Sequence, residues 1–332
     1  MVSLQQIEDA RSAIADRIHR TPLISSNTLG RRTGTRAYLK AECLQRTGSF
    51  KVRGGLNRVR TLSQDERDRG LVAVSAGNHA QAVAFAATAA GAESTVVMPE
   101  AAPRSKVEAS RRYGANVILH GTVFEAWNLG LELSRERGLT FIHPYDDPDI
   151  IAGQGTAGLE IVEDLPDVDV VVVPVGGGGL ISGIAAAVKR KRPSCKMIGV
   201  EPVGAASLTA ALAAGKPVTL DTVSTIADGL AAPHAGELVL EHARALIDDV
   251  VLVSDEEIAQ GLLFVLERAK LMLEPAGAAG VAALLCGRIN PKPDQRVAVV
   301  LSGGNIDLQR LRQLLPAGAD EDAPAAYGAL KG

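Results

Sequence analysis

The fold class of this chain follows from residues 168–188, VDVVVVPVGGGGLISGIAAAV. The run 168–175 is almost entirely valine, which is typical of a strand buried on both faces of a parallel sheet. From Leu180 the sequence is rich in Ala and Ile and predicts a helix, and glycines 176–179 allow a tight turn between the two. A strand, a glycine turn and a helix in this order are typical of an open α/β sheet.

The same alternation extends over most of the chain. We expect strands at 37–40, 71–75, 95–98, 116–119, 197–201 and 296–301, and helices at 78–90, 105–113, 124–137, 156–164, 207–214 and 255–271. Strands that alternate with helices predict parallel sheets covered on both faces. The predicted fold is therefore α/β, with two open doubly wound parallel-sheet lobes.

The division into two lobes follows from length and order. A chain of 332 residues exceeds the size of roughly 250–300 residues at which one core stops growing. Residues 61–147 form a compact set of strand–helix repeats and are predicted to be the small lobe. Residues 1–60 hold too little structure to fold independently, so we assign 1–60 and 148–332 to a discontinuous large lobe. Residues 317–332, rich in Ala, Gly and Asp, are predicted to be a flexible tail.

Composition excludes several classes of function. Hydrophobic residues make up 46% of the chain and the net charge is −3, so neither a nucleic-acid surface nor a disordered chain is expected. No apolar run is long enough to cross a membrane, and the acidic N-terminus is neither a signal nor a transit peptide. The three cysteines are far apart, which indicates a reducing compartment. We expect a cytoplasmic protein.

The glycine run has a chemical interpretation beside the structural one. Successive N–H groups of Gly176, Gly177, Gly178 and Gly179 can turn toward one anion at the start of a helix, which predicts a phosphate site. One alternative is a turn required only for close packing. Another is a dinucleotide site with Glu201 as the ribose-binding acid, but the GxGxxG spacing fails, because its last position falls on Ile181 or Ser182.

Three polar residues are further candidates. Lys51 lies between Phe50 and Val52; an isolated lysine is usually a solvated surface residue, whereas a buried one becomes nucleophilic. Ser302 follows a predicted strand, where open α/β sheets bind ligands, although it is also a common turn residue. His79 begins a helix and is by itself a structural residue. The histidines form no HxH or HExxH pair, so the sequence contains no zinc signature.

Four segments together resemble one known family. They are Thr47-Gly48-Ser49-Phe50-Lys51-Val52-Arg53-Gly54, Ser75-Ala76-Gly77-Asn78-His79-Ala80-Gln81, Pro174-Val175-Gly176-Gly177-Gly178-Gly179-Leu180 and Ser302-Gly303-Gly304-Asn305. In this order they are similar to the threonine and serine dehydratases and the serine racemases, pyridoxal 5'-phosphate enzymes of the tryptophan-synthase-β fold. The resemblance covers nearly the whole chain and implies that the cofactor lies in the cleft between the two lobes.

The resemblance implies a role for each motif. Lys51 carries the cofactor as a Schiff base and removes the substrate α-proton, and Phe50 packs near the pyridine ring. The other implied contacts are Gly176, Gly177, Gly178 and Gly179 to the phosphate, Asn78 to the ring hydroxyl, Ser302 to the pyridine nitrogen, and Ser75, Gly77, Asn78 and His79 to the substrate carboxylate. A serine hydroxyl cannot hold that nitrogen protonated as a carboxylate would, which favours β-elimination over transamination.

Two departures separate the family members. The racemases typically have a serine where this chain has Ala76, and that serine acts on the face opposite the lysine; the dehydratases commonly share the alanine. The racemases also bind Mg2+ or Ca2+ through a Glu, a carbonyl and an Asp. Glu201 and Ala205 match the first two ligands, but Ser207 replaces the Asp, which weakens a site for a hard cation. The presence of this metal stays open.

We therefore expect a dehydratase that converts L-threonine or L-serine to a 2-oxo acid and ammonia. The alternatives are serine racemase and a dehydratase of another β-hydroxy amino acid, such as 3-hydroxyaspartate or 3-phenylserine. A non-catalytic carrier of the cofactor is a further alternative, against which Lys51 and Ser302 both argue. The expected partner is a small amino-acid substrate, with no nucleic acid and no membrane, and relatives suggest a homodimer or homotetramer. Because 27 residues follow Asn305, we expect no regulatory domain of the kind that the biosynthetic threonine dehydratases carry after this point.

Overall fold

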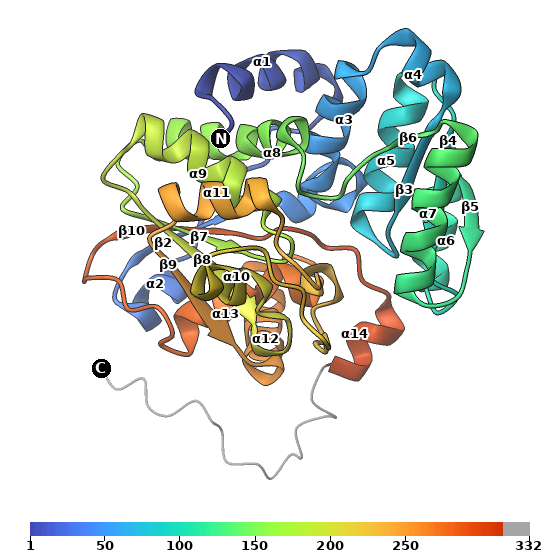
Figure 1. Cartoon of the computed structure of the whole chain (residues 1–332). Coiled ribbons are helices and arrows are strands. Elements are labelled where there is room, and N and C mark those ends of the chain that lie inside the picture. Colours follow the sequence, from blue (N-terminus) through green and yellow to red (C-terminus); the bar gives the residue numbers. More distant parts are fainter. Residues whose placement is uncertain (315–332) are drawn as a thin grey trace.

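The computed structural model describes residues 1–314 and contains two sheets, seen side by side in Figure 1. The larger sheet has the order β1-β2-β10-β7-β8-β9 and the smaller one β5-β4-β3-β6. The strands are β1 Leu23–Ser25, β2 Arg36–Lys40, β3 Leu71–Val74, β4 Ser94–Met98, β5 Asn116–Leu119, β6 Thr140–Phe141, β7 Val170–Pro174, β8 Lys196–Pro202, β9 Asp249–Val253 and β10 Arg296–Val300. All neighbours pair in parallel except β1 with β2. The predicted α/β class with parallel sheets in two lobes is confirmed, and the edge strand β1 is its one antiparallel exception.

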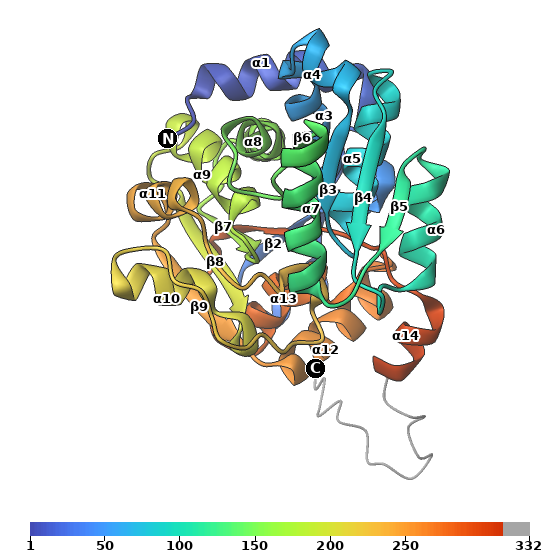
Figure 2. The same cartoon turned by 45° about the vertical axis from the view of Figure 1, so that its right-hand side comes forward.

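Helices cover both faces of each sheet, as the two views show (Figures 1 and 2). They are α1 Leu4–Ile14, α2 Asn27–Thr33, α3 Lys51–Thr61, α4 Gln64–Arg69, α5 Asn78–Ala89, α6 Arg104–Arg112, α7 Val123–Arg137, α8 Pro148–Asp164, α9 Gly179–Lys191, α10 Ser207–Ala214, α11 Glu237–Leu246, α12 Asp255–Phe264, α13 Pro275–Leu285 and α14 Leu308–Leu314. On the larger sheet, α1, α8 and α9 share one core, and α2, α12 and α13 share the other.

Strand β7 explains why the valine run is continuous. Val171 and Val173 lie in the core with α8 and α9, whereas Val170 and Val172 lie in the core with α12 and α13. Successive side chains of a strand point to opposite faces, so a strand buried on both faces has no polar position. The valine run therefore forms a strand, as predicted, and this strand lies inside the larger sheet between β10 and β8.

Helix α3 was not predicted from the sequence, although it begins at Lys51. Its interior contains Gly54 and Gly55 in succession, and glycine is the least favourable residue in a helix interior after proline. A Cβ at Gly54 would lie 2.9 Å from the Ile150 carbonyl oxygen of α8, and one at Gly55 would lie 3.1 Å from the Ala82 oxygen of α5. The helix is thus stabilised by close packing between α5 and α8.

A buried ion network joins the start of α3 to the larger sheet. Arg53 is fully buried and donates to Glu42 (2.8 Å) and to Glu160 of α8 (2.7 Å). Lys40 of β2 donates to the other oxygen of Glu160 at 2.6 Å. Two cations thus balance two carboxylates, and removal of one partner from such a network typically costs about 3–5 kcal/mol. The network fixes the turn of helix that follows Lys51.

Two further findings concern the whole described region. No helix in residues 1–314 is long and apolar enough to span a bilayer. Cys43, Cys195 and Cys286 are all free thiols. The predicted tail, residues 317–332, lies outside the described residues.

Candidate active site

Lys51 and Ser302 come from motifs far apart in sequence, and the structure brings them together. Ser49 and Gly303 pair in an isolated antiparallel bridge, and the Phe50 N–H donates to the Ser302 carbonyl at 3.1 Å. Ser302 itself is 3% exposed and lies two residues beyond the end of β10 at Val300. The Lys51 amine lies 5.3 Å from the centre of the Phe50 ring. The predicted neighbours of the cofactor ring therefore share one end of the larger sheet.

The Lys51 amine is held in a poorly solvated position. Its Nζ donates to the Pro144 carbonyl at 2.7 Å. Burial lowers the pKa of Lys51 to about 8, and the negative charge of Glu274 opposes part of that shift. A lysine with such a pKa is neutral often enough near pH 8 to act as a nucleophile or a base.

The glycine run has backbone donors without an acceptor among residues 1–314. Gly178 precedes α9 without any side-chain cap, and within residues 1–314 no protein group accepts from the N–H groups of residues 176–181. On the opposite side the glycines are crowded: a Cβ at Gly177 would overlap the Tyr145 ring, and one at Gly178 would overlap Val239. Gly178 also has φ +84°. Glycine is therefore required here for packing, and the run leaves N–H groups that an anion could bind; the phosphate site stays a prediction.

The Ser75–His79 loop lies at the end of β3 and begins α5. The Gly77 N–H donates to the Ser75 hydroxyl at 3.1 Å, and no side chain caps α5. The His79 side chain is buried and bonds to the Ile142 carbonyl at 2.9 Å. Burial lowers the pKa of His79 to about 3, so its ring is neutral and has a structural contact. Only the backbone N–H of His79 remains for an anionic group.

Asn78 connects this loop to the larger sheet. Its Nδ2 donates to Glu274 Oε1 at 2.5 Å, and its Oδ1 accepts from Asn305 Nδ2 at 2.8 Å. Asn305 also donates to the Thr47 carbonyl at 2.7 Å. Three of the four sequence motifs, all but the glycine run, are thus joined through Asn78 and Asn305.

Sequence reasoning missed the segment that links Lys51 to the glycine run. Residues 143–146 follow β6, and Pro144 accepts from Lys51 while Tyr145 packs on Gly177. Asp146 accepts from the N–H of Val239 at 3.0 Å, next to the glycine run. A position just beyond a parallel strand was the available signal, the same signal that singled out Ser302.

Glu274 is also part of the site and was not identified from the sequence. It lies directly before α13 and is 2% exposed, and a Cβ at Gly303 would lie 2.5 Å from its Oε1. Its Oε2 has no hydrogen-bond partner in the described residues, and neither have the buried hydroxyls of Thr47 and Ser49. Buried polar atoms are normally satisfied, so three unpaired ones around one loop indicate a place for a polar ligand.

Glu201 and Ala205, the candidate metal ligands, lie at the end of β8. Both carboxylate oxygens of Glu201 accept hydrogen bonds, from Leu208 N (2.8 Å), Thr209 N (2.9 Å) and Thr209 Oγ1 (2.7 Å). Glu201 thus satisfies the N-terminus of α10, a role that the sequence did not reveal. Ser207 is buried and its hydroxyl is unpaired. The divalent cation stays a prediction.

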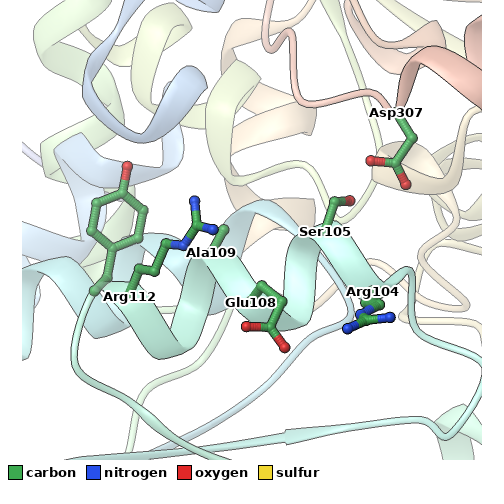
Figure 3. Close-up of a pocket in the computed structure, with 7 residues that line it drawn as sticks. Arg104, Ser105, Glu108, Ala109, Arg112 and Asp307 are labelled. Atoms are coloured by element: carbon green, nitrogen blue, oxygen red, sulfur yellow. The ribbon is translucent and has the colours of Figure 1, made fainter.

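A separate cavity of about 610 Å³ lies beside α6 (Figure 3). Arg104, Glu108 and Arg112 line it from the helix, and Asp307 faces them from the segment before α14. None of the predicted site residues lines this cavity.

The comparison with known families decides the assignment. A family model described as pyridoxal-phosphate dependent enzyme matches residues 14–303. The chain belongs to this family. Proteins similar to it include an L-threonine ammonia-lyase of Thermotoga maritima, 48% identical over 96% of this chain and 79% of that protein. A catabolic L-threonine dehydratase of Escherichia coli is 44% identical over 94% of this chain and 96% of that protein. The structure of maize serine racemase superimposes with a TM-score of 0.90 at 38% identity, covering 94% of this chain and 96% of that one.

The residues of this pyridoxal-phosphate enzyme fit the cofactor chemically. An aldehyde requires an amine that is partly neutral, which Lys51 supplies. A phosphate requires free N–H donors at a helix N-terminus, which residues 176–181 supply. Polar substituents on a ring require polar partners, which the buried Ser302 and Glu274 and the half-buried Asn78 can provide.

Proposed function

We propose that this enzyme catalyses the β-elimination of L-threonine and L-serine, releasing ammonia and 2-oxobutanoate or pyruvate. The observation that carries the proposal is the half-buried amine of Lys51, whose pKa is lowered to about 8. Proteins similar to the whole chain are named L-threonine ammonia-lyase and L-threonine dehydratase. When bound, pyridoxal phosphate withdraws electrons from the α-carbon of an attached amino acid, so that the α-proton becomes removable and a β-hydroxyl becomes a leaving group.

The cofactor is proposed to lie between the lobe of residues 1–60 and 148–332 and the lobe of residues 61–147. Gly176, Gly177, Gly178 and Gly179 would hold its phosphate, Phe50 its ring face, Ser302 its ring nitrogen and Asn78 its ring hydroxyl. Support comes from the free N–H groups at the start of α9 and from the Phe50–Ser302 hydrogen bond. Lys51 would bind the aldehyde carbon.

The start of α5 is proposed to bind the substrate carboxylate. The N–H groups of Asn78 and His79 have no acceptor among residues 1–314, and the positive end of the helix dipole favours an anion there. Ser75 and Gly77 would complete this site through the hydroxyl and the backbone. Since the His79 ring is neutral, the carboxylate would be held by backbone donors and not by a charged side chain.

Lys51 is proposed to be the base that accepts the α-proton. Near pH 8 its amine is partly neutral, so it can take up a proton and return one. Ala76, within the carboxylate loop, has no proton to exchange. The chain therefore offers a base at Lys51 and no acid or base at position 76, which favours elimination over racemisation.

The test is to measure 2-oxo acid and ammonia release by purified enzyme with L-threonine, L-serine, 3-hydroxyaspartate and 3-phenylserine. The proposal expects L-threonine or L-serine to give the highest kcat/KM. A panel in which 3-hydroxyaspartate or 3-phenylserine is clearly preferred would reassign the substrate, and no release with any of them would reject dehydration.

Serine racemase is the second candidate, and the similarity to the maize enzyme structure favours it. Chiral chromatography of the products from L-serine separates the two activities. Accumulation of D-serine at a rate comparable with pyruvate would replace the proposal.

We propose further that the enzyme is a cytoplasmic homodimer or homotetramer. The three separate free thiols support a reducing compartment. Light scattering of the purified protein tests the assembly, and a monomer at micromolar concentration would reject it.

A further inference from the structure

Glu274 is a buried carboxyl group with an unusual set of neighbours. Its backbone N–H donates to the Gly303 carbonyl at 3.1 Å, so the residue is fixed against the Ser302–Asn305 loop. It is 2% exposed and belongs to the larger sheet's side of the site, directly before α13. No salt bridge to a lysine or arginine balances it among residues 1–314. A buried acid without a paired cation is costly, so a structural role alone does not explain it.

Its one side-chain hydrogen bond orients Asn78. Because a carboxyl oxygen accepts at 2.5 Å on one side and the Asn305 amide donates at 2.8 Å on the other, the Asn78 Nδ2 must face Glu274 and its Oδ1 must face Asn305. Asn78 is the first residue of α5 and comes from the smaller sheet, whereas Glu274 and Asn305 come from the larger one. The contact therefore links the start of α5 to the larger sheet at the site.

Burial and the neighbouring charges together bring the pKa of Glu274 close to neutral pH. Burial raises the pKa of Glu274 to about 7; the charges of Lys106 and Lys51 and the Asn78 hydrogen bond lower it, while Asp228 raises it. Lys106 itself is paired with Asp228 at 2.8 Å. A hydrogen bond to an ionised carboxylate is roughly twice as strong as one to a neutral carboxyl group. The hydrogen bond from Asn78 is therefore strongest when Glu274 is charged.

We propose that Glu274 is a positioning residue of the active site: its carboxylate, through the amide of Asn78, holds the start of α5 in the orientation that the bound cofactor and substrate require. The proposal rests on the proposed function, in which Asn78 contacts the cofactor ring. Ionised Glu274 fixes one Asn78 N–H and leaves the other to the ring hydroxyl. Its unpaired Oε2 remains available to a polar group in the same site.

The test uses Glu274→Gln, which keeps the shape and the Oε1 acceptor but removes the charge. Cofactor dissociation from the holoenzyme and thermal unfolding of the cofactor-free protein are both measured at pH 6 and pH 8. At pH 8 the variant should release the cofactor about five- to tenfold faster, the difference between a charged and a neutral hydrogen bond. At pH 6, where wild-type Glu274 is mostly neutral, the two proteins should converge.

Thermal unfolding separates positioning from structure. Since the folded pKa lies above the unfolded value of 4.5, wild type loses stability as the pH rises from about 4.5 to 7. The cofactor-free variant should therefore melt higher than wild type at pH 8, and by a smaller margin at pH 6. A residue with a purely structural role would show the opposite, a lower melting temperature at both pH values.

Two further variants complete the design. Glu274→Asp keeps the charge and should recover part of the slow dissociation at pH 8. Glu257→Gln alters another glutamate at a helix start, where it caps α12 and pairs with Arg288 at 2.9 Å, and should leave cofactor dissociation unchanged.

Equal rates of cofactor dissociation for Glu274→Gln and wild type at pH 8 would overturn the proposal. A variant that released the cofactor faster by the same factor at pH 6 and at pH 8 would overturn it as well. The dissociation and unfolding measurements need no substrate. If wild type released no 2-oxo acid while the pH-dependent difference persisted, the proposed substrate would fail and the positioning role would stand.

Discussion

The ionisation of Lys51 is the property of this site that can be tested most directly. Burial lowers its pKa from 10.5 to about 8. A shift of roughly 2.5 units corresponds to about 3 kcal/mol, so at pH 7 about a tenth of the Lys51 amines should be neutral, against about 0.03% for a solvated lysine. The cofactor-free protein should thus react at this amine roughly 300 times more readily than the solvated reference at pH 7.

Competitive labelling with a trace of an acylating reagent measures the reactivity of the Lys51 amine. Cofactor-free protein is labelled between pH 6 and pH 10 and then denatured, and its remaining amines are labelled with an isotopically different form of the same reagent. The protein is digested and the ratio of the two labels on each lysine is measured by mass spectrometry. The peptide with Lys51 should show a labelling midpoint near pH 8. Lys106 is the internal control: burial disfavours its charge, but the attraction of Asp228 and Glu274 raises its pKa overall, so it should label weakly over the whole range.

The rate of cofactor attachment should follow the same curve, because only the neutral amine attacks the aldehyde. Glu274→Gln should move the Lys51 midpoint to lower pH, since the charge of Glu274 raises the Lys51 pKa. Labelling of Lys51 with a midpoint near or above pH 10 would refute the reasoning. Borohydride reduction of the holoenzyme that fixed the cofactor to a different lysine would refute the assignment of Lys51 itself.

Three other predictions follow from named contacts. Gly178→Ala should melt lower than Gly91→Ala and bind the cofactor more weakly. Both positions have positive φ, which costs about 1–2 kcal/mol for alanine. Only at Gly178 does the new Cβ also overlap a neighbour, Val239, which costs about 1–3 kcal/mol more. Equal melting of the two variants would contradict this. Ala76→Ser should raise D-serine formed from L-serine relative to pyruvate, measured by chiral chromatography, and abundant D-serine from wild type would mean that another residue supplies the second proton. If a cation binds at Glu201, a chelator should lower the melting temperature or rate and Mg2+ or Ca2+ should restore it; no change in either would remove the metal.

The elements predicted best from the sequence are those with a simple pattern. Strand β5, Asn116–Leu119, and helix α10, Ser207–Ala214, match the expected bounds at both ends. Helix α8 begins at Pro148, eight residues before the expected start at 156, because Asp147 caps it and proline is favoured in a first turn. Helix α3 could not be predicted, since tertiary packing of Gly54 and Gly55 outweighs its poor helix propensity.

The site divides in the same way. The motifs around Lys51, the glycine run and Ser302 were visible because glycine and reactive side chains mark them in the sequence. Glu274 was not visible, because nothing in the sequence before α13 tells that its carboxyl meets Asn78, nearly 200 residues earlier. Tyr145 was missed for a similar reason: its contact with Gly177 exists only in the folded chain.

The uncapped N–H groups at the start of α9 have a consequence for how the site responds to acidity. Peptide donors do not gain or lose protons in water, and a phosphate monoester is almost fully charged above about pH 7. Attraction between the glycine loop and such an anion should therefore stay constant from pH 7 upward, while Lys51 and Glu274 both titrate close to this range. With the cofactor placed as proposed, its phosphate end would be held by a contact that is insensitive to pH, and its ring end would face two groups that are sensitive to it. We therefore expect a change in cofactor retention above pH 7 to follow the ionisation of Lys51 and Glu274, and not that of the phosphate.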